Sequence, residues 1–293
     1  MDAFRFQVRK GTYVPDMSAD YPTDDPYRRL VRVQEEDSSK GRYRFDETYP
    51  YIDKSWGFRL NRIPAFFIKW VLIALYNRFH FGLRITGKEN ARKSRREAKN
   101  GAVCVCNHVF IFDALGVHSA VRRFRQVWIP MYAKHFNGSS SYILRHAGGI
   151  PLPETRGGIR KFNEAFDEYN RRKDWFIIFP EEVRWDMYAP IRPFRIGAFS
   201  MAYKYNRPVI PFVYTYRKRK GLYRLFGKKS LPCVTLHIGE PIWFDKSAPR
   251  KAELDRVRRL AHEAMERMAG IEFNPWPVSD DLFYSRKAAG SAE

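Results

Sequence analysis

Short apolar runs alternate with longer amphipathic segments along most of the chain, and this alternation limits the folds open to it. The runs are rich in small and β-branched residues, as in strands buried on both faces of a sheet. The segments between them carry apolar residues at spacings of three and four, as in helices that cover a sheet. The pattern predicts an α/β domain with a layered sheet flanked by helices. Strands are predicted at 83–87, 101–106, 127–132, 175–179, 208–214 and 233–239, and helices at 111–121, 158–172, 194–205 and 249–269.

The composition indicates a large folded core and an anionic partner. The chain has 293 residues, of which 44% are hydrophobic and 16% aromatic, enough to build one or two domains. Its formal net charge of +21 indicates binding to something negatively charged. Nucleic acid, an anionic membrane surface and a phosphorylated substrate all fit, because charge alone does not distinguish between them.

The cysteines predict neither a disulfide framework nor a metal centre. The chain has three cysteines and no apolar signal peptide at its N-terminus, which indicates a reducing cytosolic compartment. Cys104, Cys106 and His108 would share one face of a strand, so a metal site has to be considered. No fourth ligand follows at a zinc-like spacing, and a cysteine pair suits a buried strand. We therefore expect no metal and no cofactor.

The first part of the chain divides into a polar arm and an apolar helix. Residues 1–60 lack sustained periodicity, so we expect an irregular arm. The run 63–76 is apolar except for Lys69 and falls short of the about 20 residues that cross a bilayer. Arg62, Lys69 and Tyr76 recur every seven residues and so lie along one side of a helix, which leaves a broad apolar surface elsewhere.

That apolar surface, with Phe66 and Trp70 on it, is typical of a helix that lies in one leaflet of a membrane. We therefore expect a membrane-associated helix over 61–82, followed by one compact domain over 83–275 and a tail over 276–293. A helix buried in the protein core would have the same run, and the sequence leaves both alternatives open.

The segment 104–113 brings a histidine and a carboxylate to a predicted change from strand to helix. His108 and Asp113 are five residues apart, which on a straight helix separates them by roughly 140° and on a strand puts them on opposite faces. They can touch only if the chain changes from strand to helix between them, as the flanking patterns predict. A carboxylate on one ring nitrogen would then orient the imidazole for proton transfer. An isolated spacing of this kind also fits a histidine that caps a helix or fills a polar corner, so other motifs must decide.

Three further segments lie at the ends of predicted strands, where α/β proteins place their sites: 133–158, 179–184 and 207–212. Lys134 comes directly after one strand. In the glycine-rich run 148–158, Arg156 precedes a helix and is suited to binding phosphate. In the segment 179–184, Arg184 can bind phosphate through two parallel hydrogen bonds, and Glu181 can hold that arginine or an acceptor hydroxyl.

The third of these segments, 207–212, is itself a predicted strand and carries a proline in its interior. Pro211 lies within the run 207–212 and cannot donate a backbone hydrogen bond. It therefore predicts a sheet edge or a bulge beside a pocket.

In this order the four segments resemble the motif blocks of the glycerolipid acyltransferase family, of the lysophosphatidic acid acyltransferase (PlsC-like) type. The resemblance covers roughly residues 83–245. It implies the fold of that family and the transfer of an acyl group from acyl-CoA or acyl carrier protein to a hydroxyl of a lysophospholipid, such as 1-acylglycerol 3-phosphate, in phospholipid biosynthesis. The blocks are Asn107-His108 with Asp113, Gly149-Ile150-Pro151 to Arg156, Phe179-Pro180-Glu181 with Arg184, and Pro208-Val209-Ile210-Pro211.

The same resemblance assigns roles to single residues. His108 would be the general base and Asp113 its orienting partner. Arg156 and Arg184 would contact the phosphate of the acceptor, and Glu181 would lie in the acceptor site. The full set of substrate-binding candidates is Asn107, Lys134, Arg156, Glu181 and Arg184.

Two features depart from the pattern of the family. Glu182 and Val183 stand where the family usually has Gly and Thr. Two extra residues separate Pro151 from Arg156, so the phosphate contact could belong to Arg160 instead. Both departures fall in the acceptor-binding blocks, so the resemblance specifies the chemistry better than the acceptor.

A lipid acceptor would explain the apolar helix and a basic, aromatic loop at 217–229, because each cation near an anionic membrane contributes about 1 kcal/mol. We expect a peripheral or monotopic protein on the cytoplasmic side of the cell membrane. An ordinary solvated hairpin is the alternative for the loop. A catalytically silent lipid-binding relative also remains open. A nucleic-acid binder fits less well, since the sequence has no zinc-finger spacing, aromatic RNA-binding signature or basic groove-reading helix.

Overall fold

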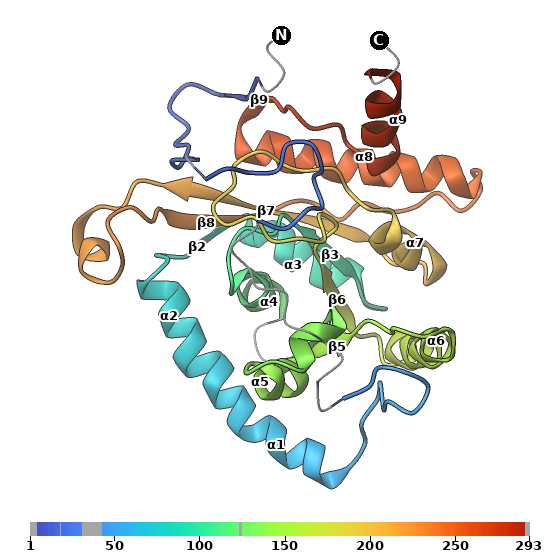
Figure 1. The fold of residues 1–293 in the computed structure, drawn as a ribbon. Helices are drawn as coiled ribbons and strands as arrows, with labels where there is room; N and C mark the ends of the chain where they lie inside the picture. Colours follow the sequence, from blue (N-terminus) through green and yellow to red (C-terminus); the bar gives the residue numbers. More distant parts are fainter. Residues whose placement is uncertain (1–4, 18, 31–42, 123–124, 291–293) are drawn as a thin grey trace.

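A seven-stranded sheet is the centre of the computed structural model, which describes residues 5–17, 19–30, 43–122 and 125–290 (Figure 1). The order across the sheet is β2-β8-β7-β3-β6-β4-β5. The strands from β7 to β5 are parallel, whereas β8 is antiparallel to β7 and parallel to β2. This sheet confirms the predicted α/β class. The strands are β2 (Arg84–Thr86), β3 (Val103–Cys106), β4 (Val127–Met131), β5 (Gly149–Pro151), β6 (Trp175–Ile178), β7 (Val209–Arg217) and β8 (Cys233–Ile238).

Helices cover both faces of the sheet, so β3 is buried in its middle (Figure 1). They are α3 (Lys88–Glu97), α4 (Asp113–Arg122), α5 (Ser141–Ala147), α6 (Arg156–Arg171), α7 (Gly197–Lys204) and α8 (Arg250–Ala269). Cys104 and Cys106 pack in the core beneath α3 and α4, whereas Val103 and Val105 pack beneath α7 and α8. The alternation of side chains along a strand thus accounts for the cysteine pair as packing.

The apolar N-terminal run forms one continuous helical arm from Trp56 to Phe79, along one side of the molecule (Figure 1). It begins before the predicted boundary at 61, because Ser55 caps it by accepting a hydrogen bond from the Phe58 N–H. Its parts are α1 (Trp56–Phe67), the π-helical segment η2 (Ile68–Ile73) and α2 (Ala74–Phe79).

One stripe of this helical arm is apolar and open to solvent, so the arm is not a buried core helix. The stripe consists of Trp56, Leu60, Ile63, Phe67, Val71, Leu75 and Phe79, all exposed. Ala65, Lys69 and Asn77 face the body of the protein instead and are buried. Within the described ranges, no helix combines the length and hydrophobicity needed to cross a bilayer.

The predicted N-terminal arm, residues 1–60, and the predicted tail, residues 276–293, both pack on the domain in their described parts. In the arm, β1 (Gln7–Val8) pairs with β9 (Ile271–Phe273), next to the end of α8. Aromatic residues of 43–52 join a core cluster with α6. The tail contains α9 (Asp280–Gly290). Residues 1–4, 18 and 31–42 of the arm and 291–293 of the tail lie outside the described residues.

Two features of the sheet and its surroundings differ from the sequence predictions. α3, with Glu89 in its first turn and arginines in its last, was not predicted. β7 is not an edge strand, since it lies between β3 and β8. Beside Pro211 the antiparallel pairing shifts by one residue, between the pairs Phe212–Ile238 and Val209–Ile242, so the strand lies at the predicted bulge and not at the sheet edge. Pro211 accepts a hydrogen bond from the Gly239 N–H and has no N–H of its own to donate.

Candidate active site

His108 and Asp113 meet where β3 gives way to α4. β3 ends at Cys106 and α4 begins at Asp113, so the chain turns between the two side chains as the spacing predicts. His108 Nδ1 lies 2.7 Å from Asp113 Oδ2. The same carboxylate oxygen accepts the backbone N–H groups of Val109 at 3.0 Å and Phe110 at 3.4 Å. Asp113 is buried, and three donors hold its Oδ2, which fixes the ring of His108.

This arrangement leaves the other ring nitrogen for chemistry. With Nδ1–H donating to Asp113, a neutral imidazole carries its lone pair on Nε2, an assignment that follows from the hydrogen-bond network. The side chain of His108 is 23% exposed, whereas that of Asp113 is 2% exposed. Phe179 stacks on the imidazole with ring centroids 4.2 Å apart. Only the histidine of the pair can therefore reach a substrate.

Asn107 supports this turn from within the sheet. Its Oδ1 accepts the Tyr214 N–H at 2.8 Å, and its Nδ2 donates to the Tyr214 carbonyl at 3.2 Å. The Tyr214 hydroxyl in turn donates to the Asp113 carbonyl at 2.7 Å. Asn107 is fully buried, so it fastens the end of β3 to β7 and offers no surface to the substrate that the resemblance assigned to it.

Glu181 likewise lies beneath the site rather than in an open acceptor pocket. It is 1% exposed, and its Oε2 accepts the His108 backbone N–H at 3.1 Å. The same oxygen forms an ion pair with Arg192 at 3.0 Å, while Oε1 accepts the Arg192 N–H at 2.9 Å. The expected acceptor contact is replaced by a positioning role, because burial leaves no face of the carboxylate free. Sequence reasoning missed Arg192, whose signal is a lone cation inside the apolar run 189–194.

Positively charged side chains from three separate segments act on His135, and so does His108. The pKa of His135 is lowered to about 4, first by burial and then by the charges of Arg29, Lys134, His108 and Arg184. Lys134 lies in the short helix after β4, and Arg184 follows β6 and pairs with Asp186 at 2.8 Å. Arg29 comes from the N-terminal arm and was not predicted. The site is therefore cationic, as binding of a phosphate requires.

Arg156 also follows the carboxyl end of a strand, but it lies farther from the His108–Asp113 pair. It is the first residue of α6, after Thr155 has capped that helix by accepting the Gly158 N–H at 3.0 Å. β5 precedes it and lies three strands from β3, a separation of about 14 Å at the usual spacing of strands. Arg156 and Arg160 are both exposed. The structure thus brings Lys134 and Arg184 toward the dyad and leaves Arg156 at the periphery.

Glu182 keeps the backbone shape of the glycine that the family usually has there. Its φ is 58°, in the left-handed region that favours glycine. Its carboxylate lies 3.4 Å from Arg195 Nε and accepts a hydrogen bond from the Tyr132 hydroxyl at 3.4 Å. Val183 is buried. The departure from the family pattern therefore changes side-chain chemistry while it preserves the turn.

No group of three or more metal-ligating side chains is placed to hold a metal ion among the described residues. Cys104 and Cys106 are buried, and burial raises the pKa of both thiols well above the ordinary range.

Comparison with known proteins gives a family match and similar solved structures. Residues 82–215 match the family model described as Acyltransferase. No curated protein matches the chain. A similar solved structure is the 1-acyl-sn-glycerophosphate (LPA) acyltransferase, PlsC, from Thermotoga maritima, at 18% sequence identity and a TM-score of 0.47, covering 74% of this chain and 85% of that chain.

The matched residues include all four motif blocks. The His-Asp pair, the run before α6, the segment with Glu181 and Arg184, and the start of β7 all fall within 82–215. The model of the family thus spans the same part of the chain as the geometry described above. Residues 82–215 of this chain therefore form a region that matches the Acyltransferase family model.

Proposed function

We propose that this acyltransferase moves a fatty acyl group from acyl-CoA or acyl carrier protein to a hydroxyl of a lysophospholipid, with lysophosphatidic acid as the first choice of acceptor. The activity would be that of a 1-acylglycerol-3-phosphate O-acyltransferase in phospholipid biosynthesis. The observation that carries the proposal is the hydrogen bond of 2.7 Å between His108 and Asp113, at a cationic edge of the sheet.

The dyad would act by general-base catalysis. An alcohol is a weak nucleophile at neutral pH, so Nε2 of His108 takes its proton while the oxygen attacks the thioester carbonyl. Asp113 stabilises the imidazolium that forms, as the third member of a triad does. The tetrahedral intermediate then expels the thiolate, and the imidazolium returns the proton to it. An ester and a free thiol result, and the histidine is neutral again.

The cations favour an acceptor with a phosphate. Lys134, Arg184 and His108 all act on the pKa of His135, and the Trp185 N–H, next to Arg184, donates to the His108 carbonyl at 3.0 Å. A guanidinium binds phosphate oxygens through paired hydrogen bonds, and a lysine adds a point charge. Arg184 already pairs with Asp186, so a phosphate would have to compete with that carboxylate. Arg156 would contact a more distant part of the substrate.

The direct test is a panel of lysolipid acceptors offered with labelled acyl-CoA and acyl carrier protein donors. We expect a labelled diacyl product that depends on donor and acceptor, with phosphate-headed acceptors preferred over uncharged ones. Mass analysis identifies the product and the better donor. Binding of lysolipids without any acyl transfer would contradict the proposal and favour a catalytically silent relative.

The exposed apolar stripe of α1, η2 and α2 supports a peripheral or monotopic position on the cytoplasmic side of the cell membrane. The turn η4 (Gly221–Leu225) extends this surface, since Leu222 and Leu225 are exposed and the rings of Phe79 and Phe226 lie 5.3 Å apart. Apolar side chains beside cations are typical of proteins that bind the interface of an anionic bilayer.

Reversing the exposed charges beside η4 is expected to release the protein from anionic vesicles at moderate salt. Arg217 and Arg219 are not suitable, because both hold backbone carbonyls. The variant therefore changes four exposed cations, which contribute about 1 kcal/mol each near the surface. Co-sedimentation measures the bound fraction. The substitutions are Lys218→Glu, Lys220→Glu, Arg224→Glu and Lys228→Glu.

A matched control reverses four exposed charges on α7 and α8, so that the change in net charge is the same. It should keep most of the vesicle binding, since the effect depends on position. Equal binding of the η4 variant and the wild type would remove this loop from the membrane surface. The control substitutions are Lys204→Glu, Lys251→Glu, Arg259→Glu and Arg267→Glu.

A further inference from the structure

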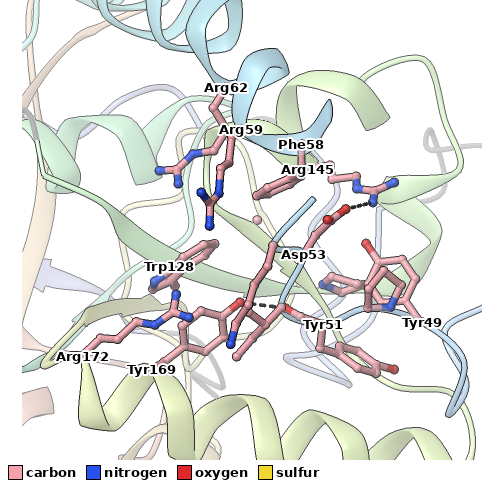
Figure 2. Close-up of a pocket in the computed structure, with 15 residues that line it drawn as sticks. Tyr49, Tyr51, Asp53, Phe58, Arg59, Arg62, Trp128, Arg145, Tyr169 and Arg172 are labelled. Carbon is pink, nitrogen blue, oxygen red and sulfur yellow. Dashed lines mark hydrogen bonds and ion pairs between the residues drawn. The ribbon is translucent and has the colours of Figure 1, made fainter. Parts of the chain in front are cut away.

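A second cationic space lies beneath α1, away from the dyad. It is a cavity of about 410 Å³ between α1, α5, the end of α6, the amino end of β4 and the short strand β5. Figure 2 shows the guanidinium groups of Arg59, Arg62 and Arg172 pointing into the same space beside Trp128. Among its described lining residues are five cations and one carboxylate: Lys54, Arg59, Arg62, Arg145 and Arg172, with Asp53.

An adjoining cavity continues this space along the helical arm. Its volume is about 360 Å³, and it shares Arg59 and Arg62 with the first. Lys69 and Arg125 line it as well, together with His118 and His146. No carboxylate is present among the described residues of this lining. The two cavities together therefore present an excess of positive charge.

Among the described residues, no carboxylate is paired with three of the cations that line the cavities: Arg59, Arg62 and Lys69. Arg145 pairs with Asp53 at 2.7 Å, so it is neutralised. By contrast, Arg62 donates to the neutral Gln126 Oε1 at 2.6 Å, and Lys69 to the Ala147 carbonyl at 2.7 Å.

Lys69 is a buried cation without a carboxylate partner in the described structure, and its pKa is lowered. It is 8% exposed, and burial, followed by the charge of Arg62, lowers its pKa to about 7. Arg59 lines both cavities and adds a further charge. Keeping cations close together and partly out of water is unfavourable unless an anion joins them.

The orientation of α1 indicates where that anion comes from. A helix on the surface of a soluble domain turns its apolar stripe inward and its charges outward. α1 has the reverse arrangement, because Trp56, Leu60 and Ile63 are exposed, while Arg62 reaches into both cavities. With the apolar stripe on a membrane, the cavities lie beside the layer of lipid headgroups.

The linings suit a phosphate. In the first cavity, Trp128, Tyr169, Tyr49 and Tyr51 are buried and form walls. Guanidinium groups supply the polar contacts, and their fork matches phosphate oxygens.

These cavities are separate from the acceptor site around His108. His118 lies five residues beyond Asp113 on α4, about 7 to 8 Å farther along the helix axis. Trp128 lies near the amino end of β4, whereas Lys134 follows the carboxyl end of the same strand. The two cationic regions thus lie toward opposite edges of the sheet.

We propose that the cavities beneath α1 bind the phosphate of an anionic phospholipid that is not a substrate, through Arg59, Arg62 and Lys69. The inference rests on the membrane position of α1 given above. The bound lipid supplies the missing counter-charge and retains the enzyme on anionic membranes. The acceptor lysolipid occupies the separate site at His108.

The test compares the wild-type chain with the double variant Arg59→Gln/Arg62→Gln on vesicles of phosphatidylcholine with and without phosphatidylglycerol. Phosphatidylglycerol is chosen because phosphatidic acid is the product of the proposed reaction. We expect phosphatidylglycerol to strengthen binding of the wild type, and the double variant to lose at least about tenfold of that affinity. The matched control Arg92→Gln/Arg96→Gln, on exposed positions of α3, should lose much less. Equal losses in both variants would mean non-specific attraction and overturn the proposal.

A second measurement separates a lipid from a free phosphate and from misfolding. Short-chain phosphatidylglycerol, below its micelle concentration, should raise the thermal unfolding midpoint of the wild type but not of the double variant. Inorganic phosphate or glycerol 3-phosphate giving the same rise would assign the site to a soluble phosphate and refute the lipid. The variant His108→Ala should bind phosphatidylglycerol as the wild type does, so failure of acyl transfer and failure of this site are distinguished.

Discussion

Replacing His108 with alanine is expected to lower kcat/KM for acyl transfer by about 100- to 10,000-fold, the usual contribution of a general base. The reason lies in the geometry: the Asp113 carboxylate, 2.7 Å from Nδ1, fixes the ring so that Nε2 can accept the hydroxyl proton. Without the imidazole, the alcohol has to attack while still protonated. Initial rates with acyl-CoA and lysophosphatidic acid measure the effect.

A control histidine separates this effect from a general loss of structure. His237 lies on β8, two strands from β3, and bonds to Thr86 at 2.9 Å and to Thr215 at 2.8 Å. The variant His237→Ala should keep most of the activity, and Asp113→Asn should lose a large part of it. A loss below about tenfold in a folded His108→Ala protein would falsify the assignment of this residue as the base.

The dyad could be predicted from the sequence because its geometry is local. A spacing of five residues and a change from strand to helix are enough to bring His108 to Asp113, and both are visible in the pattern of 101–121. The same holds for the order of strands and helices, since periodicity and turn residues act over short distances. The N-terminal helix was predicted for the same reason, although its cap at Ser55 was missed.

Contacts between distant segments could not be predicted in this way. Arg29 reaches the site from the arm, and Arg192 returns to Glu181 from a segment without periodicity. No sequence spacing links Arg29 or Arg192 to the residues that each contacts, because those residues are far away along the chain or in an irregular segment. The sequence also could not show that Glu181 faces inward, because burial depends on the packing of the whole loop. The exposure of the α1 stripe was undecided for the same reason: an apolar run looks alike in a core and at a membrane.

Removing the carboxylate of Glu181 is expected to destabilise the protein by about 3 to 5 kcal/mol, because it leaves a buried cation unpaired. Arg192 is fully buried, and its partner in the ion pair is Glu181 at 3.0 Å. The variant Glu181→Ala also removes the acceptor of the His108 backbone N–H, so activity should fall with stability. Urea unfolding followed by tryptophan fluorescence measures the change in free energy.

Two further variants show whether the buried pair is the cause. Glu164→Ala removes an exposed carboxylate on α6 that pairs with Lys161, and should change stability by no more than about 0.5 kcal/mol. Adding Arg192→Leu to Glu181→Ala should cost less than the sum of the single changes, because the second change removes the unpaired charge that the first creates. Additive losses, or a loss below about 1 kcal/mol in Glu181→Ala, would show that the pair does not hold this loop. The placement of His108 would then depend on its remaining contacts, which include the hydrogen bonds of Asp113 to the same turn and the bond from the Trp185 N–H to the His108 carbonyl.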